Sequence, residues 1–115
     1  MQIIKLPLNG GQYTQGDTFP EVLFQFSTDD AIDLTGSNIK LEIYSSTHNK
    51  IKGFSENGGI SIIDSKSFKI DAIDKEETKC FPNGILKGDL EITDPEGVRL
   101  TYLEIHFNIR KQFTR

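Results

Sequence analysis

Apolar and polar residues alternate along most of the chain, and turn-forming residues separate the alternating segments. Ile39, Leu41 and Ile43 share one face of a segment whose other face is polar, and residues 86–92 repeat this pattern. A period of two is typical of strands that bury one face. Such segments, roughly ten residues apart, predict an all-β fold: an antiparallel, immunoglobulin-like β-sandwich of about seven to nine strands.

The last predicted strand contains a break in the alternation. Asp94-Pro95-Glu96-Gly97 fits a type I turn, after which the chain returns through residues 98–109. Within this return the apolar face changes parity between Tyr102 and Leu103. A β-bulge at this point, or a strand that crosses between sheets, would restore a single apolar face.

One segment carries the signal of a helix start. Asp74 can accept a hydrogen bond from the first helical turn, while the Glu77 side chain can reach back to the cap. Pro82-Asn83-Gly84 ends the helix after about two turns. We therefore expect one short connector helix near residues 75–81.

Residues 1–15 precede a single β-sandwich domain that covers residues 16–115. The apolar run from Gln2 to Leu6 ends at Pro7, which limits it to an edge strand or an assembly arm. An apolar strand at a terminus can add to the sheet of a neighbour. The candidate assembly contacts are Ile3, Ile4 and Leu6. The sequence leaves open whether this segment pairs within the fold or across subunits.

Composition and charge narrow the classes of function. The chain has 15 Ile and 9 Thr against 2 Ala, which favours strands over helices. A net charge of −4 offers no basic surface for nucleic acid. No stretch approaches the roughly 20 apolar residues of a membrane span, so no membrane insertion is expected. The N-terminus lacks the apolar run of a signal peptide, which favours synthesis in a cytoplasm.

Candidate catalytic residues are few. Glu104 lies two residues from His106 on the same face of the last strand, which is the spacing a base and its orienting carboxylate could use. The lone Cys80 cannot form an intrachain disulfide or a cysteine zinc cluster, and it follows a short surface helix. An exposed strand histidine explains His106 better, so we expect no catalytic residue and no enzyme.

Two candidate binding features remain. Acidic residues gather in two loops, at Asp29, Asp30 and Asp33 and at Asp94 with Glu96. Calcium would accept such ligands, but Asp is also a common turn residue, so we expect neither a metal nor a cofactor. Tyr44 occupies the polar phase of its strand and could offer an exposed ring to a glycan.

Short motifs follow one another in order from residue 16 to the end of the chain. They are Gly16-Asp17-Thr18-Phe19, Ile32-Asp33-Leu34-Thr35-Gly36, Gly58-Gly59-Ile60-Ser61-Ile62, Pro82-Asn83-Gly84, residues 88–97 and Thr114-Arg115. In this order they resemble a family of short β-sandwich proteins encoded in phages and prophages among virion structural genes. The family's immunoglobulin-like fold is similar to the N-terminal domain of baseplate upper proteins.

The resemblance implies a non-catalytic structural protein of a phage or prophage particle. Such a protein would be synthesised in the host cytoplasm and assembled into the virion, in the tail, the baseplate or another accessory part. Its partners would be other virion proteins or copies of itself. The chain departs from the family in residues 1–15 and at Cys80-Phe81, where small residues are common. The alternative is a carbohydrate-binding β-sandwich module used in host or surface recognition.

Overall fold

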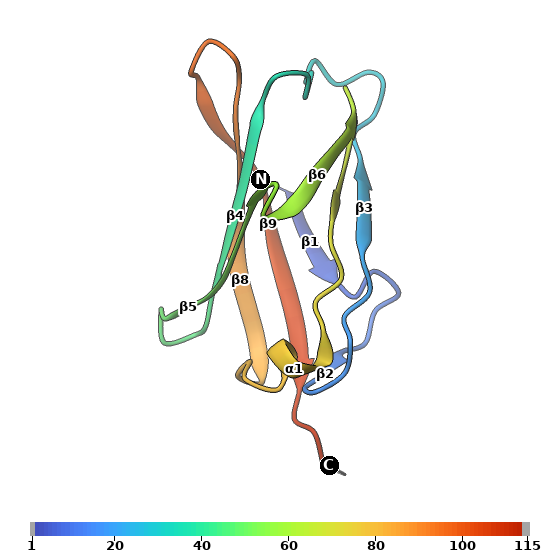
Figure 1. Ribbon diagram of the computed structural model, residues 1–115, viewed down its shortest axis with the longest axis vertical. Helices are drawn as coiled ribbons and strands as arrows, with labels where there is room; N and C mark the ends of the chain where they lie inside the picture. Colours follow the sequence, from blue (N-terminus) through green and yellow to red (C-terminus); the bar gives the residue numbers. More distant parts are fainter. Residues whose placement is uncertain (1, 114–115) are drawn as a thin grey trace.

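The computed structural model describes residues 2–113, so Met1 and the closing motif Thr114-Arg115 lie outside the described residues. Within that range the chain is mostly β, with nine strands and one short helix (Figure 1). The elements are β1 (Gln2–Leu6), β2 (Tyr13–Thr14), β3 (Val22–Gln25), β4 (Asn38–Tyr44), β5 (Lys50–Glu56), β6 (Gly59–Asp64), β7 (Ser67–Ile70), α1 (Lys75–Thr78), β8 (Gly84–Thr93) and β9 (Arg99–Arg110). The predicted all-β class is confirmed.

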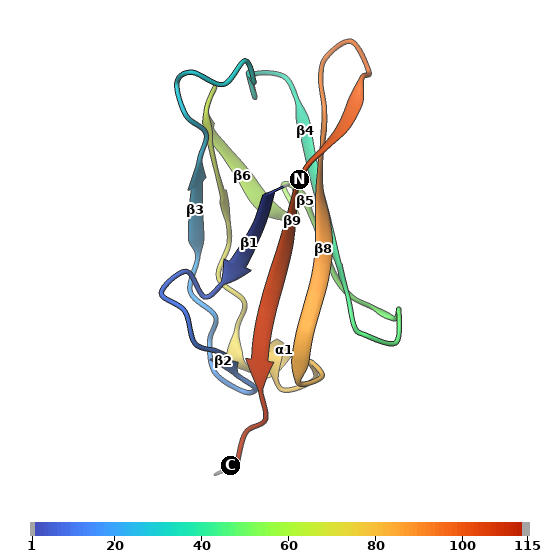
Figure 2. The ribbon, with the colours of Figure 1, turned by 180° about the vertical axis from the view of Figure 1, so that it is seen from behind.

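The strands form one sheet that curls into two facing layers. Its order is β1-β9-β8-β4-β5-β6-β7-β3, and the short β2 also pairs with β9. Strands β6, β7 and β3 face β4, β8 and β9 across the core (Figures 1 and 2). Within residues 2–113, the layers are linked by hydrogen-bonded strands only at the parallel pairs Ser55–Gly59 and Glu56–Ile60. The fold is therefore a β-sandwich whose layers remain connected along one side.

The prediction of a wholly antiparallel sandwich is wrong, because the sheet is mixed. β1 and β2 both run parallel to β9, and β5 runs parallel to β6. In the first case the N-terminal strands lie beside the last strand of the chain and point the same way. In the second, Asn57 in the loop between the strands and Gly59 at the start of β6 take positive φ angles of 64° and 98°. The chain changes layer there without reversing direction.

The expected break in the last strand is a β-bulge. Leu90 of β8 pairs with Leu103, but Glu91 pairs with Thr101, which leaves Tyr102 as the extra residue of β9. The Tyr102 ring meets the Phe26 ring of the other layer edge-on, with centroids 6.1 Å apart. The bulge therefore lets both Tyr102 and Leu103 turn toward the core, which accounts for the parity change.

Helix α1 is one turn long, shorter than the expected 75–81. The Asp74 side chain accepts a hydrogen bond from the Glu77 N–H at 2.9 Å, as its cap position predicts. The Glu77 carboxylate does not return to the cap; it accepts a hydrogen bond from Lys52 Nζ at 2.7 Å. The turn that follows α1 brings Phe81 into the core against Phe19.

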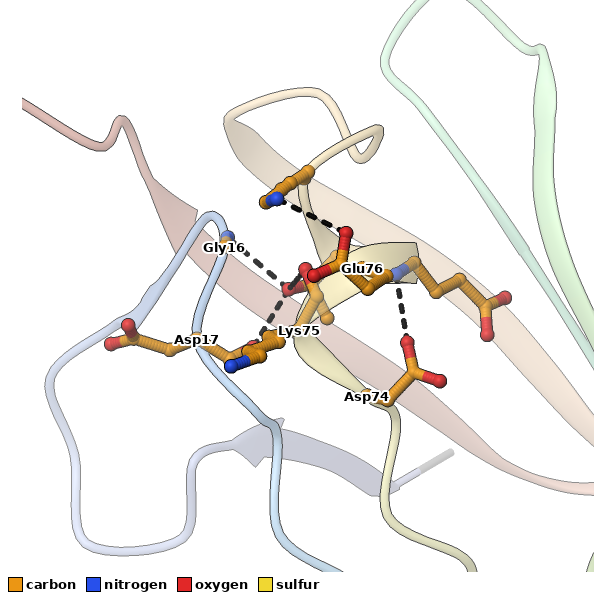
Figure 3. Close-up of polar contacts among 8 residues, drawn as sticks. Gly16, Asp17, Asp74, Lys75 and Glu76 are labelled. Carbon is orange, nitrogen blue, oxygen red and sulfur yellow. Dashed lines mark hydrogen bonds and ion pairs between the residues drawn. The ribbon is translucent and has the colours of Figure 1, made fainter. Parts of the chain in front are cut away.

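Buried Thr78 ties α1 to the start of the sandwich (Figure 3). Its hydroxyl accepts a hydrogen bond from the Gly16 N–H at 3.1 Å and donates one to the Asp17 carbonyl at 2.7 Å. The helix thus holds the segment that leads from β2 toward β3.

Candidate functional site on the outer face of the sheet

Charged side chains gather on the outer face of strands β1, β9, β8 and β4. Along β4, β8 and most of β9, buried residues alternate with more exposed ones. Paired residues on neighbouring strands project from the same face of a sheet. The strand register therefore arranges the outward side chains in rows that run across the sheet.

One of these rows is acidic. Glu42 of β4 pairs with Asp89 of β8, and Asp89 pairs with Glu104 of β9. Glu104 pairs in turn with Ile3, which ends the row on the edge strand β1. We call these four residues the acidic row. Like charges directly opposite one another destabilise a sheet, so the row carries a folding cost.

The adjacent row carries basic groups. Tyr44 of β4 pairs with Lys87 of β8, which pairs with His106 of β9. His106 pairs with Lys5, which ends this row on β1. We call these four residues the lysine row. The edge of the sheet therefore presents an acidic row that ends in Ile3 beside a basic row that ends in Lys5.

Local partners neutralise part of the acidic row. The Glu42 carboxylate forms an ion pair with Lys50 Nζ at 2.7 Å, and Lys40 Nζ lies 3.7 Å from its other oxygen. The hydrogen bond from Lys50 lowers the pKa of Glu42, and the same contact raises the pKa of Lys50. His106 Nε2 hydrogen-bonds to Glu104 across the two rows. Among residues 2–113, no side chain forms an ion pair or hydrogen bond with Asp89.

Tyr44 lines an open groove of about 650 Å³ on this face. The residue is 38% exposed. Glu42, Asp89 and Lys87 of the sheet also line the groove, together with Ser45, Ser46 and His48 of the loop after β4. The groove thus combines one aromatic face with carboxylates and hydroxyl groups, which are the groups that a polar ligand such as a sugar would contact.

The candidate assembly contacts divide by face. Ile3 points outward and is 48% exposed, whereas Ile4 is half-buried against the core. Leu6 is 1% exposed, because the alternation along β1 turns its side chain toward the core, beside its paired residue on β9. Leu6 therefore belongs to the core of its own chain and is not available to a partner. Within the described segment, residues 2–6 and 13–14 pair inside the fold.

The candidate catalytic groups lie on separate elements. His106 contacts Glu104 on β9, whereas Cys80 is exposed in the turn after α1. Cys80 is not among the residues that line the groove beside Tyr44. The structure therefore does not bring a thiol and a base together on the outer face.

The acidic loops have local structural roles. Asp33 accepts a hydrogen bond from the Thr35 N–H at 2.9 Å, and this bond lowers the pKa of Asp33. Asp94 accepts hydrogen bonds from the N–H groups of Glu96 and Val98. Asp30 accepts one from Ser27 N–H. In residues 2–113, no three His, Cys, Asp or Glu side chains are arranged to hold a metal ion.

A smaller groove of about 260 Å³ lies where the two ends of the curled sheet approach each other. Gln2 and Ile4 of β1 line one side of it, and Phe24 of β3 and Phe26 line the other. β1 and β3 are the two ends of the strand order. The sheet therefore has two free edges and does not close into a barrel.

Sequence reasoning missed Lys5, Lys87, Asp89 and Glu104 as members of ordered rows. Alternation alone marks them as outward-facing residues. Their alignment depends on the register of β1 on β9 and of β9 on β8, which joins distant parts of the chain. The available signal in the sequence was that Lys87 and Asp89, two residues apart on the outward face of one strand, carry opposite charges.

Comparisons with known proteins gave only distant structural likenesses. No family model and no curated protein matches the chain. The chain is similar to the crystal structure of CopC from Methylosinus trichosporium OB3b, with a TM-score of 0.47 and 12% identity over 91% of each chain. It is also similar to murine CRIg, with a TM-score of 0.36 and 12% identity over 96% of this chain and 94% of that one. No helix within residues 2–113 has the length and apolar character needed to cross a membrane.

Proposed function

We propose that this protein is a non-catalytic assembly module of a phage or prophage particle, built on an immunoglobulin-like β-sandwich. It is synthesised in the host cytoplasm and joins the tail, the baseplate or another accessory part of the virion. The ordered motifs of residues 16–115 support the phage assignment through the family they resemble. Other virion proteins or further copies of the chain are its partners.

The observation that carries the assembly role is the pair of free sheet edges. The strand order ends at β1 and at β3, and among the described residues each has a strand neighbour on one side only. Free edges pair with other chains unless they are protected. Both carry an exposed apolar side chain, Ile3 at 48% and Leu23 at 61%. Exposed apolar groups on free edges favour contact with other proteins.

Particle purification tests this role. The protein, carrying a small C-terminal epitope, is expressed during the phage or prophage cycle, and particles are isolated on a density gradient. We expect the protein to sediment with intact particles at a fixed copy number relative to the major structural proteins. Recovery only as a free protein, with none in the particle fraction, would contradict the proposal.

The groove beside Tyr44 supports a second candidate, a carbohydrate-binding module for host or surface recognition. Tyr44 is 38% exposed and shares the groove with carboxylates and serines, so a sugar could stack on its ring and hydrogen-bond to these neighbours. A glycan array, run with and without calcium, tests for binding. Tyr44→Ala should remove the signal, and Tyr44→Phe, which keeps the ring, should retain most of it. Equal signals from all three proteins would exclude this groove.

A further inference from the structure

The free edge of β1 is the starting point. β1 has five residues, all in parallel register with β9. In the described part of the chain, no backbone hydrogen bond joins residues 2–6 to any segment other than β9. Figure 2 shows β1 alongside β9, and the smaller groove separates its other side from β3. The outer face of this edge shows Ile3 and Lys5, the ends of the acidic and lysine rows.

We propose that β1 pairs antiparallel with β1 of a second copy, about a twofold axis at Ile4, so that two sheets become one. A closed dimer with one shared interface uses the same strand from both copies, and a twofold axis makes the two strands antiparallel. With the axis at Ile4, all five residues pair: Ile3 lies opposite Lys5 of the second copy, and Gln2 lies opposite Leu6. A shift of one residue would place the outer face of one copy against the inner face of the other.

Charge complementarity selects this register. With the axis at Ile4, the acidic row of one copy runs directly into the lysine row of the other, on both sides of the axis. An axis at Ile3 would join two acidic rows, and an axis at Lys5 would bring two lysines together. Like charges directly opposite across strands are unfavourable. The alternative registers also pair fewer residues.

The side chains are long enough to make the contact. Neighbouring strands lie roughly 4.8 Å apart, so Lys5 of the second copy and Glu104 stand about 10 Å apart at the backbone. A lysine laid across Ile3 spans most of this distance and covers the exposed apolar side chain with its methylene groups. Ile3, which is 48% exposed in the single chain, is thereby covered in the dimer.

The dimer deepens the proposed assembly function and rests on it for its biological role. A contact through strands of five residues is smaller than the roughly 1,200 Å² of a typical stable interface. We therefore expect weak association of the isolated protein. Fixed neighbours in a particle would strengthen it through a high effective concentration.

Disulfide trapping tests the register directly. In a Cys80→Ser background, one protein carries Ile3→Cys and the other carries Lys5→Cys, with tags of different mass. Opposed residues of an antiparallel pair have Cα atoms about 4.5–5.5 Å apart, within the range that a disulfide bridges. Leu100→Cys, exposed on β9 outside the paired segment, measures random collision. All three sites are exposed, and melting curves check that each variant folds.

We expect the mixed Ile3→Cys and Lys5→Cys disulfide to form roughly tenfold faster than the Leu100→Cys dimer, because only the first pair is held in bonding geometry. Each variant alone should match the Leu100→Cys control. A dominant Ile3→Cys homodimer, or a mixed dimer that forms no faster than the control, would overturn the proposal. If the protein is found in particles but does not cross-link, the dimer is refuted and the phage role is not. If it cross-links but is absent from particles, the phage role is refuted and the dimer is not.

Discussion

At the scale of single residues, Thr78 shows how one buried hydroxyl joins two segments that are distant in sequence. Its oxygen accepts from the Gly16 N–H and donates to the Asp17 carbonyl (Figure 3). Thr78→Val keeps the shape of the side chain and removes both bonds. We expect the free energy of unfolding to fall by about 1–3 kcal/mol in chemical denaturation. Thr78→Ser keeps the hydroxyl and should lose less; a larger loss for Ser than for Val would contradict the role of the hydrogen bonds.

Glu42 provides a residue-scale test of charge in the acidic row. The hydrogen bond from Lys50 holds the pKa of Glu42 below its ordinary value of 4.5. A lowered folded-state pKa means that the ionised carboxylate adds stability above pH 4.5, which is lost as the pH falls through the folded-state value. Lys50→Met should raise the pKa of Glu42 in a carboxyl NMR titration and flatten this acid-range loss of stability.

The matched control for that titration is Lys40→Met. Lys40 lies 3.7 Å from the Glu42 carboxylate, against 2.7 Å for Lys50. Its removal should therefore raise the pKa of Glu42 by less. A Glu42 pKa that does not change in Lys50→Met, or that changes more in Lys40→Met, would show that the cross-strand pair is not the cause.

At the scale of elements, the close approach of β4 and β8 depends on Gly88. A Cβ atom at this position would collide with the backbone carbonyl oxygen of Glu42, which cannot move without separating the two strands. Gly88→Ala should lower the free energy of unfolding by about 1–3 kcal/mol, as overpacking does in cores. In Gly53→Ala the added carbon comes closest to the flexible end of Lys50 and reaches Glu42 Cγ only at an ordinary contact distance, so a small effect is expected. Equal losses in the two variants would refute the backbone collision.

Elements also mark the limit of what the sequence could predict. Alternation in residues 38–44 and 86–92 reports which side chains are buried, and the structure confirms strands β4 and β8 there. The parity change between Tyr102 and Leu103 likewise predicted a bulge or a crossing between sheets, and the structure contains the bulge. The parallel pairing of β1 with β9 was not predictable, because alternation does not tell which distant strand is the neighbour. The charged rows depend on that pairing and were missed with it.

At the scale of the whole molecule, the N-terminal strand completes the core beside the C-terminal one. Leu6 is 1% exposed and Ile3 is 48% exposed, although they belong to one strand of five residues. Leu6→Ala should lower the free energy of unfolding by about 2–5 kcal/mol, through lost burial and a residual cavity. Ile3→Ala should change it by no more than about 0.5 kcal/mol in the monomer.

Measurements at different protein concentrations distinguish a β1 strand that packs on its own chain from one that is exchanged between subunits. If β1 packs on β9 of its own chain, the loss in Leu6→Ala is the same in dilute and concentrated protein, because no second copy takes part in the packing. An exchanged arm would make the loss depend on concentration, since unfolding would then include dissociation. Denaturation curves that coincide over a hundredfold range of concentration would place Leu6 in its own core, and would leave Ile3 and Lys5 as the part of β1 that is open to a partner.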